Sequence, residues 1–175
     1  MHTESAIPYR HPVWDWLAQP TALFGGVYGL LVSSSAVAAL TEFGEVTRAQ
    51  RMDDALWVLF TALASALAHG YAHQIAHRDP KNHPGVRGVV RAVLAEWPLV
   101  LAALPTTLLL CGAGLGWWRS QGIEYVAFGI NTALLLCWGL LASRATGRTW
   151  GRAVRIGCAD ALLGVAVALA STLLK

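Results

Sequence analysis

Long runs of apolar residues, separated by short polar connections, are the main pattern along this chain. The runs cover residues 23–40, 55–76, 89–116, 125–142 and 153–174. Four of them are close to the roughly 20 residues that an α-helix needs to cross the hydrocarbon core of a bilayer, and the run 89–116 is longer. None alternates apolar and polar residues in the way a barrel strand does. The pattern therefore predicts an all-α integral membrane bundle of five transmembrane helices.

The third run is the least regular, because Pro98 and Pro105 lie inside it. One interpretation is a single span that contains Glu96. The other is an amphipathic surface helix over residues 86–96, followed by a span that starts at Pro98, since proline is favoured in the first turn of a helix. The choice decides whether Glu96 lies within the membrane or at its surface.

Composition agrees with a membrane class. The 175 residues are 55% hydrophobic and 13% charged, whereas soluble domains are roughly 25% charged. The three cysteines, Cys111, Cys137 and Cys158, lie in apolar stretches and are expected to be free thiols. Residues 1–19 contain His, Pro, Trp and acidic residues and no signal-peptide core, so we expect an interfacial segment there. Residues 20–175 then form one five-helix transmembrane domain.

Basic residues indicate the orientation, because cytoplasmic loops of membrane proteins are enriched in Lys and Arg. With five spans, nine of the 13 basic residues share the side of the N-terminus: Arg10, Arg78, Lys81, Arg87, Arg91, Arg144, Arg148, Arg152 and Arg155. This predicts a cytoplasmic N-terminus and an outside C-terminus. A composition rich in Arg and poor in Lys suggests a bacterial source, and hence a multi-pass protein of the bacterial plasma (inner) membrane. Anionic lipid headgroups are expected at the basic cytoplasmic loops.

Small residues recur at every fourth position in two of the runs. These are Gly25, Gly29 and Ser33 in the first, and Ala153, Gly157 and Ala161 in the fifth. Such series let helices approach closely in lipid, either within one chain or between copies. Because five short helices enclose little space, we expect a homo-oligomer, with packing inside the chain as the alternative.

Polar residues within apolar runs are costly in lipid and usually face the protein interior or water. The second run carries a polar stripe at steps of four, formed by Thr61, Ser65, His69, His73 and His77. Each such step drifts only about 40° around a helix, so these residues share one slowly winding face. Two imidazoles at i and i+4 suit a metal ion or proton transfer.

Two carboxylates fall in the same half of the membrane as these histidines, namely Glu96 and Asp160. His69, His73 and Glu96 therefore form a candidate site for a divalent metal ion such as Fe, Mn or Zn, while the same groups with Asp160 suit a proton relay. The structural alternatives are an interfacial His77 and Glu96, and an Asp160 paired with an Arg. Asn131 in the fourth run is better explained by a hydrogen bond between helices than by a ligand role.

The connection between the first two runs is acidic. It contains Glu42, Glu45, Asp53 and Asp54, together with two arginines, Arg48 and Arg51. An acidic outer mouth would concentrate cations. A solvated loop whose charges pair with one another explains the same residues without a function.

Several segments resemble small actinobacterial membrane proteins of unknown activity. These are the strings AHGYAH at 68–73, EWP at 96–98 with AALP at 102–105, and WGLLA at 138–142. A fainter similarity is to metal transporters of the vacuolar iron transporter type, which also have five helices and a last helix rich in small residues. That resemblance implies iron or manganese transport. Those transporters carry an acidic cytoplasmic extension, whereas residues 77–91 here are short and basic.

The sequence favours a protein that handles cations. It contains no HExxH, Walker A or GxSxG motif, so an enzyme is not expected, and nucleic acid is not an expected partner. The leading hypothesis is a proton or divalent-metal channel or transporter that uses the His and carboxylate cluster. The alternative is a small membrane subunit or scaffold whose polar residues stabilise helix packing.

Overall fold

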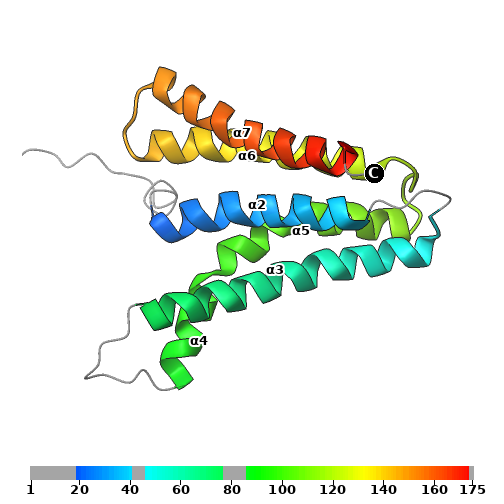
Figure 1. Cartoon of the computed structure of the whole chain (residues 1–175), viewed down its shortest axis with the longest axis horizontal. Helices are drawn as coiled ribbons and strands as arrows, with labels where there is room; N and C mark the ends of the chain where they lie inside the picture. Colours follow the sequence, from blue (N-terminus) through cyan, green and yellow to red (C-terminus); the bar gives the residue numbers. More distant parts are fainter. Residues whose placement is uncertain (1–18, 41–45, 77–85, 174–175) are drawn as a thin grey trace, which may run out of the picture.

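Six helices make up the regular structure of the residues that this computed structural model describes, which are 19–40, 46–76 and 86–173. They are α2 (Pro20–Leu40), α3 (Arg48–Ala76), α4 (Val86–Ala95), α5 (Trp97–Gly114), α6 (Ile123–Ala145) and α7 (Trp150–Leu173). All except α4 are long and apolar enough to cross a membrane. α2 begins and α7 ends at opposite ends of the bundle, as five crossings require (Figure 1). The prediction of an all-α protein with five membrane-spanning helices is confirmed, while the side on which each end lies stays a prediction.

The third apolar run is two helices rather than one span. α4 and α5 are separated at Glu96, and Pro98 lies in the first turn of α5. The backbone N–H of Glu96 still donates to the carbonyl of Val93, and the carbonyl of Glu96 accepts from Leu99 N–H, both at 3.0 Å. The helix boundaries confirm the interpretation in which a separate amphipathic helix precedes a span that begins near Pro98. The placement of that helix, and of Glu96, at the membrane surface stays a prediction. The continuous span over 89–116 is wrong, because the chain turns at Glu96.

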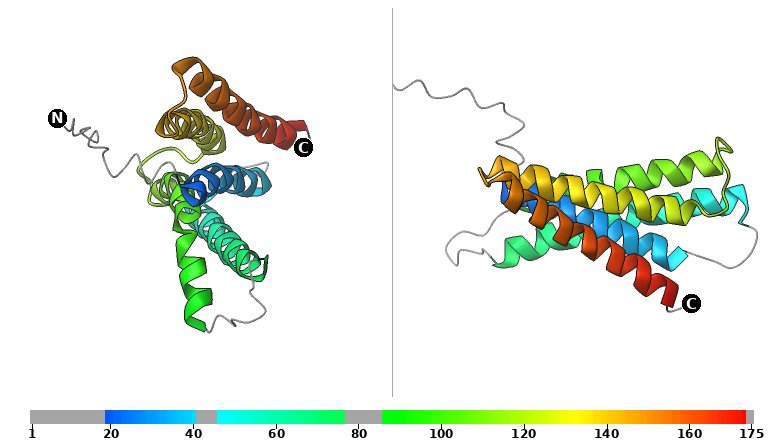
Figure 2. Two further views of the ribbon diagram at one scale, coloured as in Figure 1. Left: turned by 90° about the vertical axis from the view of Figure 1, so that its left-hand side faces the viewer. Right: turned by 90° about the horizontal axis from the view of Figure 1, so that it is seen from above.

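α5 is the centre of one half of the bundle. It packs against both α2 and α3, while α6 and α7 form a second closely packed pair that α2 joins to the rest (Figure 2). The face of α3 toward α5 carries small and medium apolar residues at helical spacing: Ala55, Val58, Ala62 and Ala66. These residues and their partners on α5 form the buried apolar core. α2 therefore has α3 on one side and α7 on the other, as Figure 1 also shows.

The small-residue series are used within the chain. A Cβ on Gly29 would lie 2.4 Å from the backbone carbonyl oxygen of Leu99, and a Cβ on Gly157 would lie 2.7 Å from that of Leu136. Glycine at these positions lets α2 approach α5 and lets α7 approach α6. Both series are accounted for by these contacts, so they give no support to the expected homo-oligomer, which stays a prediction.

A buried hydrogen-bond triad joins three helices inside the bundle. Thr106 Oγ1 on α5 donates to Asn131 Oδ1 on α6 at 2.9 Å, and Asn131 Nδ2 donates to Ser34 Oγ on α2 at 3.0 Å. All three side chains are almost fully buried. Asn131 is thus a link between helices, as the structural interpretation of the sequence expected.

A buried ion network lies at the end of the bundle where α3 begins. The guanidinium of Arg51, which is only 1% exposed, donates to Glu124 Oε1 at 2.5 Å, to Asp54 Oδ2 at 3.2 Å and to the carbonyl of Ser120 at 2.9 Å. Glu124 belongs to the first turn of α6. The network therefore ties the start of α3 to the start of α6 and to the connection before it.

Candidate functional site

The polar group that stands out in this bundle is Glu96, at the corner between α4 and α5. It is 4% exposed, and its Oε2 has no hydrogen-bond partner among the described residues. Its Oε1 lies 3.7 Å from Nε2 of His69 on α3. This distance is too long for a direct hydrogen bond and short enough for an ion pair when the imidazole is protonated. A buried carboxylate with an unused oxygen, next to an imidazole, is a typical arrangement for binding or transferring a proton.

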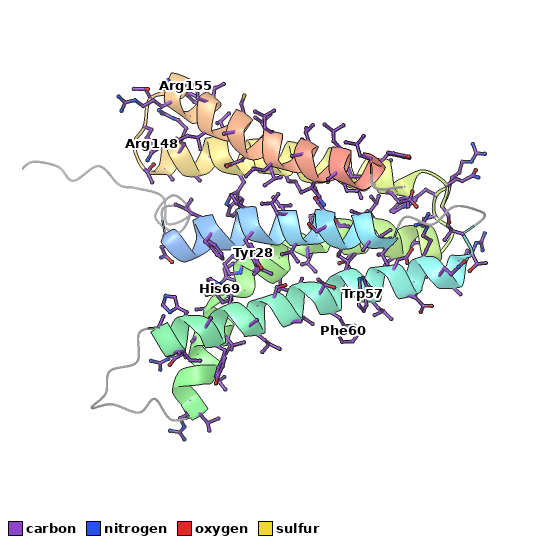
Figure 3. All side chains as sticks on the ribbon, viewed as in Figure 1. Tyr28, Trp57, Phe60, His69, Arg148 and Arg155 are labelled. Atoms are coloured by element: carbon purple, nitrogen blue, oxygen red, sulfur yellow. The ribbon has the colours of Figure 1, made fainter. Side chains whose placement is uncertain are left out.

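Two aromatic side chains from α2 cover the imidazole. Phe24 stacks on His69 with ring centroids 4.4 Å apart and planes inclined by 16°, and Tyr28 lies 6.4 Å from the same ring. Phe24 and Tyr28 also stack on each other at 5.1 Å. Figure 3 shows Tyr28 and His69 facing each other across the space between α2 and α3. The aromatic contacts fix the plane of the imidazole and shield one of its faces.

An open cavity of about 540 Å³ extends from His69 along α3 to Thr61, near the midpoint of that helix. It is lined by Tyr28, Thr61, Ala64, Ser65, Ala68 and His69. Thr61, Ser65 and His69, which the sequence places on one stripe, therefore line one cavity. Thr61 donates its hydroxyl to the carbonyl of Trp57 in its own helix at 2.8 Å. A third of the His69 side chain is exposed, so the cavity reaches the imidazole while Glu96 lies behind it.

The position of the pair relative to a bilayer follows from helix length. α3 has 29 residues and is therefore about 44 Å long at 1.5 Å per residue. The hydrocarbon core is about 30 Å thick. For a helix centred in the membrane, His69 lies about 10 Å from the midplane and His73 about 16 Å from it. His69 is then within the hydrocarbon layer, and His73 is at its boundary.

The structure places the remaining residues predicted for the site as follows. His73 is exposed on α3, and His77 lies outside the described residues. Asp160 lines a different cavity, between α2, α6 and α7. Asn131 belongs to the hydrogen-bond triad. In the described part of the chain no group of three His, Cys, Asp or Glu side chains is placed to hold a metal ion, so the metal site of His69, His73 and Glu96 stays a prediction.

The predicted acidic mouth is only partly described. Glu42 and Glu45 lie outside the described residues, and Asp53 is exposed on α3. Asp54 pairs with Arg51. This ion pair agrees with the alternative in which the charged residues of this connection pair with one another.

Five residues have partners that the sequence did not indicate. Phe24 was one of many apolar residues in its run, and nothing in the pattern indicated that it would meet His69. Arg51 and Glu124 are 73 positions apart. Their position next to apolar spans indicated that each needs a partner, but not which residue that partner is. Ser34 and Thr106 became visible as partners of Asn131 only in the folded chain.

No family model, curated protein or solved structure matches this chain. The functional argument therefore rests on the geometry described above.

Proposed function

We propose that this protein handles cations in a membrane, with the His69–Glu96 pair as its proton-exchanging centre. The observation that carries the proposal is the buried Glu96 carboxylate, whose Oε2 has no described partner and whose Oε1 lies 3.7 Å from an imidazole that an open cavity reaches. Placing a carboxylate in such a position costs free energy, and proteins tolerate this cost mainly where the group is used.

The shape of the cavity favours a transporter over an open pore. Its polar lining runs from His69 to Thr61, which is next to the midpoint of α3. One turn further toward the start of α3, the same face carries the apolar side chain of Trp57. A cation that enters beside His69 thus finds polar side chains along only half of the helix. Passage from one side to the other would require the helices to rearrange.

A proton is the cation that fits the described donors best. The pair supplies one imidazole nitrogen and one carboxylate, which suffices for proton exchange and is fewer than the four to six ligands that Zn, Fe or Mn ions usually take. Divalent metal transport remains the alternative cargo, because water and substrate anions complete many metal sites.

Flux measurements on the full chain in liposomes test the proposal. A pH-sensitive dye inside the vesicles reports proton movement when a potassium gradient with valinomycin sets the membrane potential, and a metal-sensitive dye reports divalent cations. The informative variants are His69→Phe, which keeps a ring against Phe24 without a titrating group, and Glu96→Gln, which keeps the shape without the charge. Tyr71→Phe removes an exposed hydroxyl from α3 outside the cavity and is the matched control.

We expect flux in the wild type and in Tyr71→Phe, and at least about tenfold less in His69→Phe and Glu96→Gln, as is usual for loss of a proton-transfer group. A wild-type protein that moves no cation under any gradient would refute the function. Flux that persists in both site variants would refute the site.

The second candidate is a membrane scaffold, favoured by the way the other buried polar groups pair with one another. The Ser34–Asn131–Thr106 triad and the Arg51 network join helices, and these contacts account for their polar groups. If His69 and Glu96 are one more such link, Glu96→Gln should lower the unfolding temperature in detergent in a protein that shows no flux.

A further inference from the structure

A second cavity, of about 200 Å³, lies between α2, α6 and α7 at the end of the bundle where α6 ends. Its walls include Leu23 and Val27 of α2, Ser143 of α6 and Asp160 of α7, and Arg148 of the connection between α6 and α7 is at its edge. Figure 3 shows Arg148 at this end of the bundle. The cavity is larger than the roughly 150 Å³ cavity that can hold benzene in an engineered protein. It therefore has room for a small polar group with its apolar attachment.

Two polar side chains of this cavity, those of Ser143 and Asp160, are not used by the fold. Ser143 is only 5% exposed, and its Oγ has no hydrogen-bond partner among the described residues. Asp160 makes no hydrogen bond or ion pair with them either. A Cβ at Gly139 would fall 2.1 Å from Asp160 Oδ2, so the glycine leaves the space that the carboxylate occupies. A buried hydroxyl and a half-buried carboxylate that face the same space require a ligand or water.

The edge of the cavity carries the opposite charge in a fixed backbone. Arg148 N–H donates to the Ser143 carbonyl at 3.2 Å, and Arg144 Nη1 donates to the Arg148 carbonyl at 2.6 Å. Arg144 also lies 4.5 Å above the ring of Trp150. The connection is thereby tied to the ends of α6 and α7, and the Arg148 side chain is exposed beside the opening.

We propose that this cavity binds a primary ammonium group next to a phosphate, as in the headgroup of phosphatidylethanolamine. The ammonium would donate to the Asp160 carboxylate and to Ser143 Oγ, while Arg148 would bind the phosphate. Leu23 and Val27 present an apolar wall for the start of the acyl region. A choline headgroup has the same charges but no N–H donor, so it cannot donate a hydrogen bond to Ser143 Oγ or to the Asp160 carboxylate. This proposal does not depend on the function proposed for His69 and Glu96.

Native mass spectrometry and thermal unfolding of the full chain in detergent test this site. The probes are phosphatidylethanolamine, phosphatidylcholine with the same acyl chains, and soluble phosphoethanolamine. We expect phosphatidylethanolamine to bind more tightly than phosphatidylcholine and to raise the unfolding temperature. Asp160→Asn should weaken this binding by about ten- to hundredfold, and Ser143→Ala by about two- to tenfold, as expected for charged and neutral hydrogen bonds. Asp53→Asn, at the far end of α3, should bind as the wild type does.

The three probes separate the sources of the ammonium group. Tight binding of soluble phosphoethanolamine that Asp160→Asn abolishes would support the ammonium site with a soluble ligand instead of a lipid. Equal binding of the two phospholipids would overturn the proposal, and so would binding that Asp160→Asn and Ser143→Ala leave unchanged. Unfolding without added lipid shows whether Asp160→Asn is folded, and Ser143→Ala carries the test if it is not.

Discussion

Arg51 provides a direct test of how much a buried ion network stabilises this bundle. Its guanidinium is held by Glu124, Asp54 and the carbonyl of Ser120, and it is almost completely buried. Arg51→Met keeps most of the apolar volume and removes the charge. The substitution leaves Glu124 buried with its partner gone, and a carboxylate in that position has lost both its Coulomb attraction and a charged hydrogen bond.

The size of the effect follows from two independent estimates. Two unit charges about 4 Å apart attract by about 4 kcal/mol at the effective dielectric constant that describes most protein sites. Removal of one partner from a buried ion pair costs about 3–5 kcal/mol in measured cases. We therefore expect Arg51→Met to lower the free energy of unfolding by about 3–5 kcal/mol. The double variant Arg51→Met, Glu124→Leu removes both charges and should be more stable than the single one, with a coupling of about 1–3 kcal/mol.

Unfolding with SDS in mixed micelles measures these differences. The eight tryptophans supply a fluorescence signal, and Asp53→Asn serves as the control for loss of an exposed charge on the same helix. If the single substitutions Arg51→Met and Glu124→Leu add up in the double variant, the two residues do not interact, and the argument for a coupled network is refuted.

Two further predictions concern packing and hydrogen bonding within the bundle. Asn131→Leu breaks the bonds to Ser34 and Thr106 and should lower the free energy of unfolding by about 1–2 kcal/mol, the upper part of the range for bonds between membrane helices; a stability equal to that of the wild type would show that water replaces the triad. Gly29→Ala should cost about 1–3 kcal/mol because its Cβ meets the Leu99 carbonyl. Gly129→Ala, where a Cβ meets nothing within 4 Å, should be neutral or slightly stabilising, and SDS unfolding of the two variants should differ accordingly.

The spans were predictable because lipid imposes a strong condition on sequence. An apolar run of about 20 residues has few structural alternatives to a transmembrane helix, and each of the five runs contains one helix that is long and apolar enough to cross a membrane. The ends were less predictable. α3 begins at Arg48, seven residues before its apolar run, where Thr47 and Gln50 form a capping box: Gln50 N–H donates to Thr47 Oγ1 at 3.3 Å, and Thr47 N–H donates to Gln50 Oε1 at 2.8 Å. The pairing of Arg51 with Glu124, 73 positions away, has no such local signal.

For the candidate site, the sequence predicts which residues share a face of one helix, but not which residues of other helices they meet. The spacing of Thr61, Ser65 and His69 fixed their common face, since helix geometry is regular. Which helix meets that face depends on how helices pack, and the close approach of Gly29 to Leu99 decides this for α2 and α5. Glu96 came to His69 because α4 turns away from α5 at this residue. Asp160, which the sequence predicts to lie in the same half of the membrane as His69, lies on the other side of α2.

The placement of α2 has a consequence for both proposed sites. Tyr28 on one face of this helix lines the His69 cavity, and Leu23 and Val27 on another face line the Asp160 cavity. α2 therefore lines both cavities, and a displacement of this helix that widens one cavity changes the shape of the other. Any ligand that moves α2 couples the two affinities, and the coupling free energy must be the same whichever ligand binds first. Through this one helix, lipid binding at the Asp160 cavity would change the cation affinity at His69, and the reverse, although the two sites share no residue.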